Sequence, residues 1–290
     1  MLDETVLVGE HYGIATPRLK YGAGPPSDAL IDNSFVCVEI ELENASKVDI
    51  THDARWVHHR DGSLRDNGVE FVFRCPLNGQ SVIDALTNLE AAVAPHKVSL
   101  SPRTSVHVHV DASDLTKRQL RDLILLYMIW EDVIFKTYAP ERYGNHFCLP
   151  FNQCLDLLPA PLWLTNSLND FANNVNTPAV GRYCAFNLKS IFKFGSVEFR
   201  HLGGAYKAAD ILEWVNTCLA FKRGCYQPLD VRTMYFEASQ HGFKDQLRQY
   251  FPKPTVDRVL ERYKDENEFH HDVLEGVLRA QHLCYPKYYL

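Results

Sequence analysis

The segment of this chain that most strongly indicates chemistry is residues 35–43, where acidic and apolar side chains alternate. As a β-strand, the segment places four aliphatic residues on one face and the carboxylates of Glu39, Glu41 and Glu43 on the other. Three carboxylates along one face repel one another unless water or a cation neutralises them. Two interpretations stay open: an edge strand with a solvated acidic face, or a row of oxygen ligands for a hard divalent cation.

A second alternating segment, residues 105–111, carries two histidines on one face. His107 and His109 lie opposite three valines if the segment is a strand. Two imidazoles on one strand face can bind a metal ion or phosphate groups. The alternative is an exposed histidine pair on a solvated sheet.

Two further segments have the same one-sided form. Glu198 and Arg200 share a face of residues 196–200, either as an ion pair of little energetic weight or as a metal carboxylate beside a guanidinium for phosphate oxygens. Glu70 alternates with apolar neighbours, shortly after a turn at Asp61-Gly62. If the four strands are neighbours, the sheet has one apolar face and one face that can hold divalent cations and a polyphosphate.

The hydrophobic periodicity indicates which elements position these side chains. It predicts strands at 35–43, 55–59, 69–73, 105–111, 183–188 and 196–201, and helices at 81–94, 117–138, 164–174 and 208–223. Capping signals are expected at 81–84 and near Asp114, and a hairpin around Phe194-Gly195. Because the connections near the motifs are short, we expect an α+β fold: an antiparallel sheet with helices packed on one face.

Three regions are predicted along the chain. Residues 1–34 contain a Gly/Pro cluster and are expected to form an irregular lead-in, and residues 35–224 a single domain. Residues 225–290 are predicted to be a helical extension packed on that domain, with helices near 231–240, 255–264 and 267–283. Covering the site and mediating assembly are both open roles for this extension.

Composition excludes several functional classes. A net charge of −6 without a basic stripe argues against broad nucleic-acid binding. The eight cysteines form no CxxC pair, which argues against a zinc cluster, and a disulfide framework is not expected in a chain of 290 residues. The longest apolar run, residues 123–130, is too short to span a bilayer. No signal peptide is recognised, so a cytoplasmic protein without a membrane partner is expected.

Taken in order, the motifs resemble those of the amidoligases, carboxylate–amine ligases of the glutamine synthetase superfamily related to glutamate–cysteine ligase. The resemblance runs from about Phe35 to Gly224. It is carried by 38–41, 61–63, 68–70, 107–109, Arg142 with Asn145 and Cys148, 182–184 with Asn187, and 197–200 before Gly203-Gly204. Ala205 stands where many relatives have Thr, which puts one substrate contact in question. Glu43 has no counterpart in the motif and is expected to be solvated.

The resemblance implies a curved antiparallel sheet whose concave face binds ATP and two or more Mg²⁺ (or Mn²⁺) ions. The implied metal ligands are Glu39, Glu41 and Glu198. The implied phosphate-binding residues are His107, His109, Arg182 and Arg200. Arg142, Asp61 and Asn187 are implied in substrate binding. Arg200, Glu70 and Asp61 are implied in catalysis, with Arg200 at the transferred phosphoryl group, Glu70 near the metal or the amine substrate, and Asp61 on the amine side.

The implied reaction joins a small-molecule or peptide carboxylate to an amine donor, as an amide or isopeptide, through an acyl phosphate. Positioning and charge neutralisation would account for most of its catalysis. The alternatives are a phosphotransferase that stops at the phosphorylated product, a metal-dependent hydrolase on the same sheet, and a catalytically decayed binding or inhibitor protein. The fold does not select the substrates, and assembly into a homo-oligomer is left open.

Overall fold

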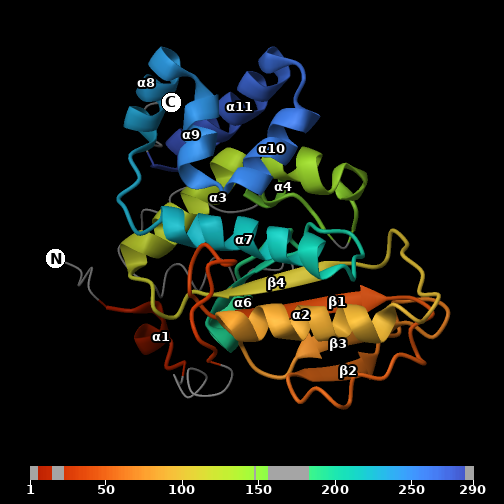
Figure 1. Cartoon of the computed structure of the whole chain (residues 1–290). Helices are drawn as coiled ribbons and strands as arrows, with labels where there is room; N and C mark the ends of the chain where they lie inside the picture. Colours follow the sequence, from red (N-terminus) through yellow and green to blue (C-terminus); the bar gives the residue numbers. More distant parts are fainter. Residues whose placement is uncertain (1–5, 15–22, 147, 156–182, 285–290) are drawn as a thin grey trace. The chain divides into compact units, whose positions relative to one another are not determined.

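The structure is a computed structural model, and it describes residues 6–14, 23–146, 148–155 and 183–284 (Figure 1). The chain divides into two compact units. One, here called the sheet unit, contains residues 15–111 and 198–219; the other, the helical unit, contains residues 1–14, 112–197 and 220–290. Each unit is built from segments that are distant in the sequence. The domain limits at 34/35 and 224/225 stay a prediction.

The strands form a six-stranded antiparallel sheet in the order β2-β3-β1-β4-β6-β5, which confirms the predicted α+β class. The strands are β1 (Val36–Leu42), β2 (Trp56–Arg60), β3 (Val69–Phe73), β4 (Val106–Asp111), β5 (Phe186–Asn187) and β6 (Ser196–Phe199). In Figure 1, β2, β3, β1 and β4 follow one another in this order. The predicted alternation is therefore realised in adjacent strands.

The register of the sheet brings the acidic and histidine positions face to face. Glu41 of β1 pairs with Glu70 of β3, and Glu39 pairs with His107 of β4. Because successive side chains alternate across a strand, these four residues share one face of the sheet. The other face is apolar and buried, and it includes Val36, Val38, Ile40, Val69, Phe71, Phe73, Val106, Val108 and Val110.

Helix α2 (Gln80–Val93) packs against the apolar face of the sheet. The indole Nε1 of Trp56 on β2 donates a hydrogen bond of 3.0 Å to the carbonyl of Ala85 on α2. The capping box expected at 81–84 is wrong: the N-cap is Gly79, and among the described residues no side chain caps this helix. The backbone of Pro25 crosses there instead, and its carbonyl accepts the amide hydrogen of Gln80 at 2.8 Å.

The helical unit is organised around α3 (Lys117–Tyr138), whose predicted limits are confirmed. The cap expected near Asp114 is formed by another residue. Thr116 caps the helix in a reciprocal pair with Gln119, and Asp114 binds Lys222 at 2.7 Å instead. The other helices with residues in this unit are α1 (Val8–His11), η2 (Pro140–Arg142), α4 (Phe151–Leu155), α6 (Ser190–Phe194), the end of α7 (Ala208–Gly224), α8 (Val231–His241), α9 (Phe243–Tyr250), α10 (Lys253–Arg262) and α11 (Glu266–Cys284).

Helix α11 lies directly against α3. A Cβ atom on Gly276 would stand 2.3 Å from the carbonyl oxygen of Ile129, so only glycine permits this approach. Two ion pairs join the same helices, Lys136 with Asp272 at 2.7 Å and Arg279 with Asp132 at 2.8 Å. The C-terminal helices were predicted except for α9, and the helix expected at 164–174 lies outside the described residues.

The hairpin expected around Phe194-Gly195 is wrong, because a short helix separates β5 from β6. Helix α6 ends at Gly195, whose φ of 69° is the left-handed conformation that commonly terminates helices. The Ser190 hydroxyl is hydrogen bonded to the carbonyls of Asn187 at 2.9 Å and Ser196 at 2.7 Å. These bonds close the connection as a helical turn.

Candidate functional site

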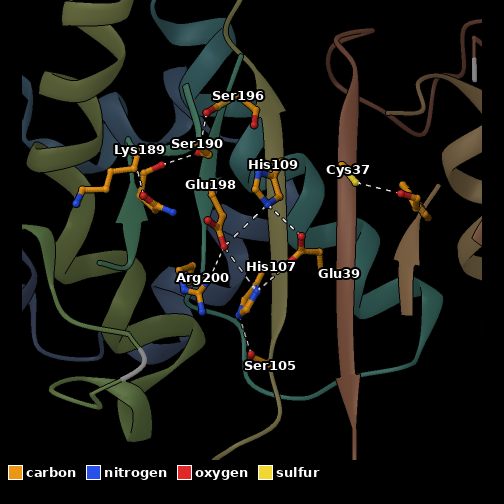
Figure 2. A network of polar contacts seen from close by, with 12 residues as sticks. Cys37, Glu39, Ser105, His107, His109, Lys189, Ser190, Ser196, Glu198 and Arg200 are labelled. Atoms are coloured by element: carbon orange, nitrogen blue, oxygen red, sulfur yellow. Dashed lines mark hydrogen bonds and ion pairs between the residues drawn. The ribbon is translucent and has the colours of Figure 1, made fainter. Parts of the chain in front are cut away.

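The polar face of the sheet unit contains most of the residues singled out from the sequence. Figure 2 shows Glu39, His107, His109, Glu198 and Arg200 among them. They come from β1, β3, β4, β6 and the loop after β2: Glu39, Glu41, Asp61, Glu70, His107, His109, Glu198 and Arg200. Glu41, His107, His109 and Glu198 are buried, and Glu39 is partly exposed. The face is therefore not the solvated acidic edge that the sequence left open.

One group of side chains, here called the mixed cluster, contains Glu39, His109 and Glu198. Their potential ligand atoms all lie within 4.8 Å of one another. His109 Nε2 is 3.4 Å from Glu39 Oε1 and 4.0 Å from Glu198 Oε1. Arg200 lies beside this cluster, where its Nη1 donates a hydrogen bond to Glu198. A nitrogen and two carboxylates in this arrangement can bind a divalent metal ion.

A second group, here called the oxygen cluster, contains Glu41, Asp61 and Glu70. Their carboxylate oxygens also lie within 4.8 Å of one another. Glu41 and Glu70 are cross-strand partners, whereas Asp61 comes from the loop between β2 and β3. An all-carboxylate donor set is the kind that hard cations such as Mg²⁺ prefer.

Ser105 connects the two clusters and was not identified as a site residue from the sequence. Its hydroxyl donates a hydrogen bond to Glu41 Oε2 and lies 2.8 Å from His107 Nε2. The other ring nitrogen, His107 Nδ1, is 3.2 Å from Glu39 Oε2. A chain of polar contacts therefore runs from the oxygen cluster to the mixed cluster. The signal was present in the sequence, since Ser105 shares the strand face of the two histidines.

The charges of the mixed cluster stabilise one another. Burial raises the pKa of Glu39, but hydrogen bonds and positive charge from His107 and His109 bring it well below its usual range. The pKa of Glu198 is also lowered, because His109 and Arg200 outweigh the effect of burial. Burial lowers the pKa of His109, yet Glu39 and Glu198 together raise it. The two carboxylates are therefore ionised at neutral pH.

The oxygen cluster behaves differently. Burial and then the negative charges of Glu39, Glu41 and Asp61 raise the pKa of Glu70 to about 7. A carboxyl group that titrates near neutral pH can accept and release a proton during a reaction. The same repulsion means that a cation among these carboxylates would be stabilising.

Two neighbours of the site, one buried and one exposed, differ from what the sequence indicated. The expected solvation of Glu43 is wrong: only 4% of this residue is exposed, and its Oε1 accepts the Arg65 amide hydrogen at 2.9 Å. His59 was not identified as a site residue, although it pairs with Glu70 in the register and is exposed on the same face.

The remaining predicted residues are not part of the sheet unit. Arg142 and Asn187 belong to the helical unit, where Arg142 is buried at the end of η2 and Asn187 Oδ1 accepts the amide hydrogen of Lys189 at 2.9 Å. Arg182 lies outside the described residues. A role for these three in binding substrate or phosphate stays a prediction.

Comparison with known proteins identifies the family. A family model described as "Putative amidoligase enzyme" matches residues 32–222, which include every residue of the two clusters. No curated protein shows a significant match to the chain. Within the described ranges, no helix is both long enough and apolar enough to cross a membrane. With the family model covering well over half of its length, the chain belongs to the amidoligase family.

Proposed function

We propose that this protein is an ATP- and Mg²⁺-dependent carboxylate–amine ligase that forms an amide or isopeptide bond. The observation that carries the proposal is the pair of clusters on one sheet face, linked through Ser105 and flanked by Arg200. Family membership supports the ligase class. The relation of amidoligases to glutamine synthetase further supports a curved sheet with the clusters on its concave face.

The donor sets fit divalent cations. Glu39 and Glu198, with His109, would hold one ion, and Glu41, with Asp61 and Glu70, would hold another. The close approach of three carboxylates supports this assignment, because their negative charges, after burial, raise the pKa of Glu70 and would be neutralised by a cation. Bound Mg²⁺ or Mn²⁺ would neutralise the phosphate groups of ATP.

The basic residues of this face would act on the phosphoryl group. The substrate carboxylate attacks the γ-phosphorus of ATP, and the bond to the ADP oxygen breaks, which yields an acyl phosphate and ADP. We propose that Arg200, oriented by Glu198, contacts the transferred group and that His107 contacts the phosphates, since His109 is already counted among the ligands of the first ion. Charge stabilisation by these fixed groups would lower the barrier of this step.

The second step forms the amide. The amine nitrogen attacks the acyl carbon, the carbon–oxygen bond to phosphate breaks, and the nitrogen loses a proton. Glu70 is the proposed acceptor of that proton because it is a half-buried carboxylate of the oxygen cluster, and Asp61 lies beside it. Arg142, Arg182 and Asn187 remain the proposed contacts for the carboxylate substrate, which is a small molecule or a peptide.

A screen of carboxylate and amine pairs tests this function, with ADP release and the product mass measured in the same reaction. We expect steady ADP release and a condensed product only when ATP, Mg²⁺, a carboxylate and an amine are all present. A phosphorylated product without amine would indicate a phosphotransferase. Cleavage without ATP would indicate a metal-dependent hydrolase. ATP binding without turnover for any pair would indicate a binding or inhibitor protein.

A further inference from the structure

The loop that carries Asp61, residues 61–68 and here called the Asp61 loop, is held in place by contacts from outside itself. The carboxylate of Glu43 accepts the amide hydrogen of Arg65 at 2.9 Å. The amide of Asn44 donates to the carbonyl of Asp66 at 3.0 Å, and Arg103 Nη1 donates to the carbonyl of Ser63 at 2.8 Å. Three hydrogen bonds, made by the chain after β1 and by the segment before β4, thus hold the loop in place.

The backbone of this region is strained. Asn44, Asp66 and Asn67 have φ angles of 55°, 50° and 55°, a left-handed conformation that non-glycine residues rarely adopt. Gly68 is required at the end of the loop, since a Cβ there would stand 2.3 Å from the Cβ of Leu64. Such a conformation persists only where the surrounding contacts enforce it.

Glu43 is positioned to hold the Asp61 loop in this conformation. It lies two residues after Glu41 and on the same face, and its backbone is fixed by reciprocal hydrogen bonds with Ser99 of 2.8 and 3.1 Å. We infer that Glu43 is a positioning residue that holds the Asp61 loop, and so brings the Asp61 carboxylate to the oxygen cluster. The effect of Glu43 on catalysis, as distinct from its effect on the loop, rests on the proposed function.

The three acids of residues 39–43 then have three separate tasks. Glu39 belongs to the mixed cluster, Glu41 belongs to the oxygen cluster, and Glu43 holds the loop that delivers the third carboxylate of the oxygen cluster. Asp61 is repelled by Glu41 and Glu70 when no cation is bound. Without the Glu43 contact, the loop has less to oppose that repulsion, and Asp61 should withdraw.

Titration of the full chain with Mn²⁺ alone, followed by calorimetry and electron paramagnetic resonance, tests this inference. We expect wild-type protein to bind two Mn²⁺ ions. Glu43→Ala should weaken one of them by about 10–100-fold, as loss of an outer-shell contact typically does, and Asp61→Asn should weaken the same one. Glu43→Gln keeps an oxygen acceptor for the Arg65 amide and should stay within about threefold of wild type.

Folded Glu43→Ala protein that binds both ions with wild-type affinity would overturn the inference, and so would equal losses in Glu43→Ala and Glu43→Gln. If Glu43→Ala does not fold, Arg103→Ala serves instead, because Arg103 is exposed and its side chain donates a hydrogen bond to the loop at the Ser63 carbonyl. It should weaken the same ion severalfold, and unchanged binding would contradict the inference. Wild-type protein that binds no Mn²⁺ would count against the proposed function as well.

Discussion

Ser105 and Glu41 are hydrogen bonded across neighbouring strands, with the serine hydroxyl donating to Glu41 Oε2. The same hydroxyl lies 2.8 Å from His107 Nε2, so a single side chain orients one member of the oxygen cluster and one phosphate-binding candidate. Orientation of ligands by such outer contacts commonly decides metal affinity and activity.

Ser105→Ala is therefore expected to impair turnover without unfolding the protein. Loss of the hydroxyl leaves Glu41 and His107 free to reorient, and we expect the rate of ADP release to fall by about 10–100-fold. Ser105→Thr keeps the hydroxyl and should recover most of that loss. Equal turnover in Ser105→Ala and wild type would show that the contact is dispensable.

The crossing of α3 and α11 gives a prediction for stability. Gly276→Ala would place a methyl group 2.3 Å from the Ile129 carbonyl oxygen, so the two helices must separate. We expect the free energy of unfolding in urea to fall by about 1–3 kcal/mol, the usual cost of overpacking. Gly62→Ala is the matched control, since nothing lies within 4 Å of a Cβ at that position. Similar values for both variants would contradict the close packing.

Glu131 in α3 makes stability depend on pH. Burial raises its pKa to about 7 from a usual 4.5, although the Tyr127 hydroxyl and the amides of Phe151 and Asn152 act to lower it. The folded state therefore retains this proton more strongly than the unfolded state. The contribution of Glu131 to stability is full below pH 4.5 and is lost as pH rises to about 7.

Glu131→Gln removes this titration. The free energy of unfolding of wild type relative to Glu131→Gln should decrease between about pH 4.5 and 7, by at most about 3 kcal/mol, and then level off. Urea denaturation of both proteins at intervals between pH 5 and 8 measures the difference. A difference that does not vary with pH would show that Glu131 has an ordinary pKa.

Local patterns predicted much of the fold. The limits of α3 and β3 follow from apolar periodicity within each segment, and the one-sided strands predicted that Glu39, Glu41, His107 and Glu198 would share a face. The predictions for Glu43 and for the start of α2 failed because a contact from a distant residue decides the outcome. Glu43 is buried, and its carboxylate accepts the amide hydrogen of Arg65, which lies 22 residues away.

The same reason explains what the sequence left unassigned. Ser105 acquires its role only because β1, 64 residues earlier, brings Glu41 beside it. The Asp61 loop brings the Asp61 carboxylate to the oxygen cluster. Two of its residues, Asp66 and Asn67, have a left-handed backbone conformation, and neither is the glycine that usually indicates this conformation in a sequence. Long-range strand pairing and strained loops are not encoded in a short window of sequence.

Glu41→Gln tests the central claim most directly, because Glu41 contributes both to the oxygen cluster and to the link through Ser105. The substitution keeps the size of the side chain and removes its charge. With a carboxylate and amine pair that supports wild-type turnover, ADP release should fall by at least about 100-fold, while circular dichroism and the melting temperature stay close to wild type. Wild-type turnover by folded Glu41→Gln protein would contradict the assignment of this sheet face as the ATP and metal site.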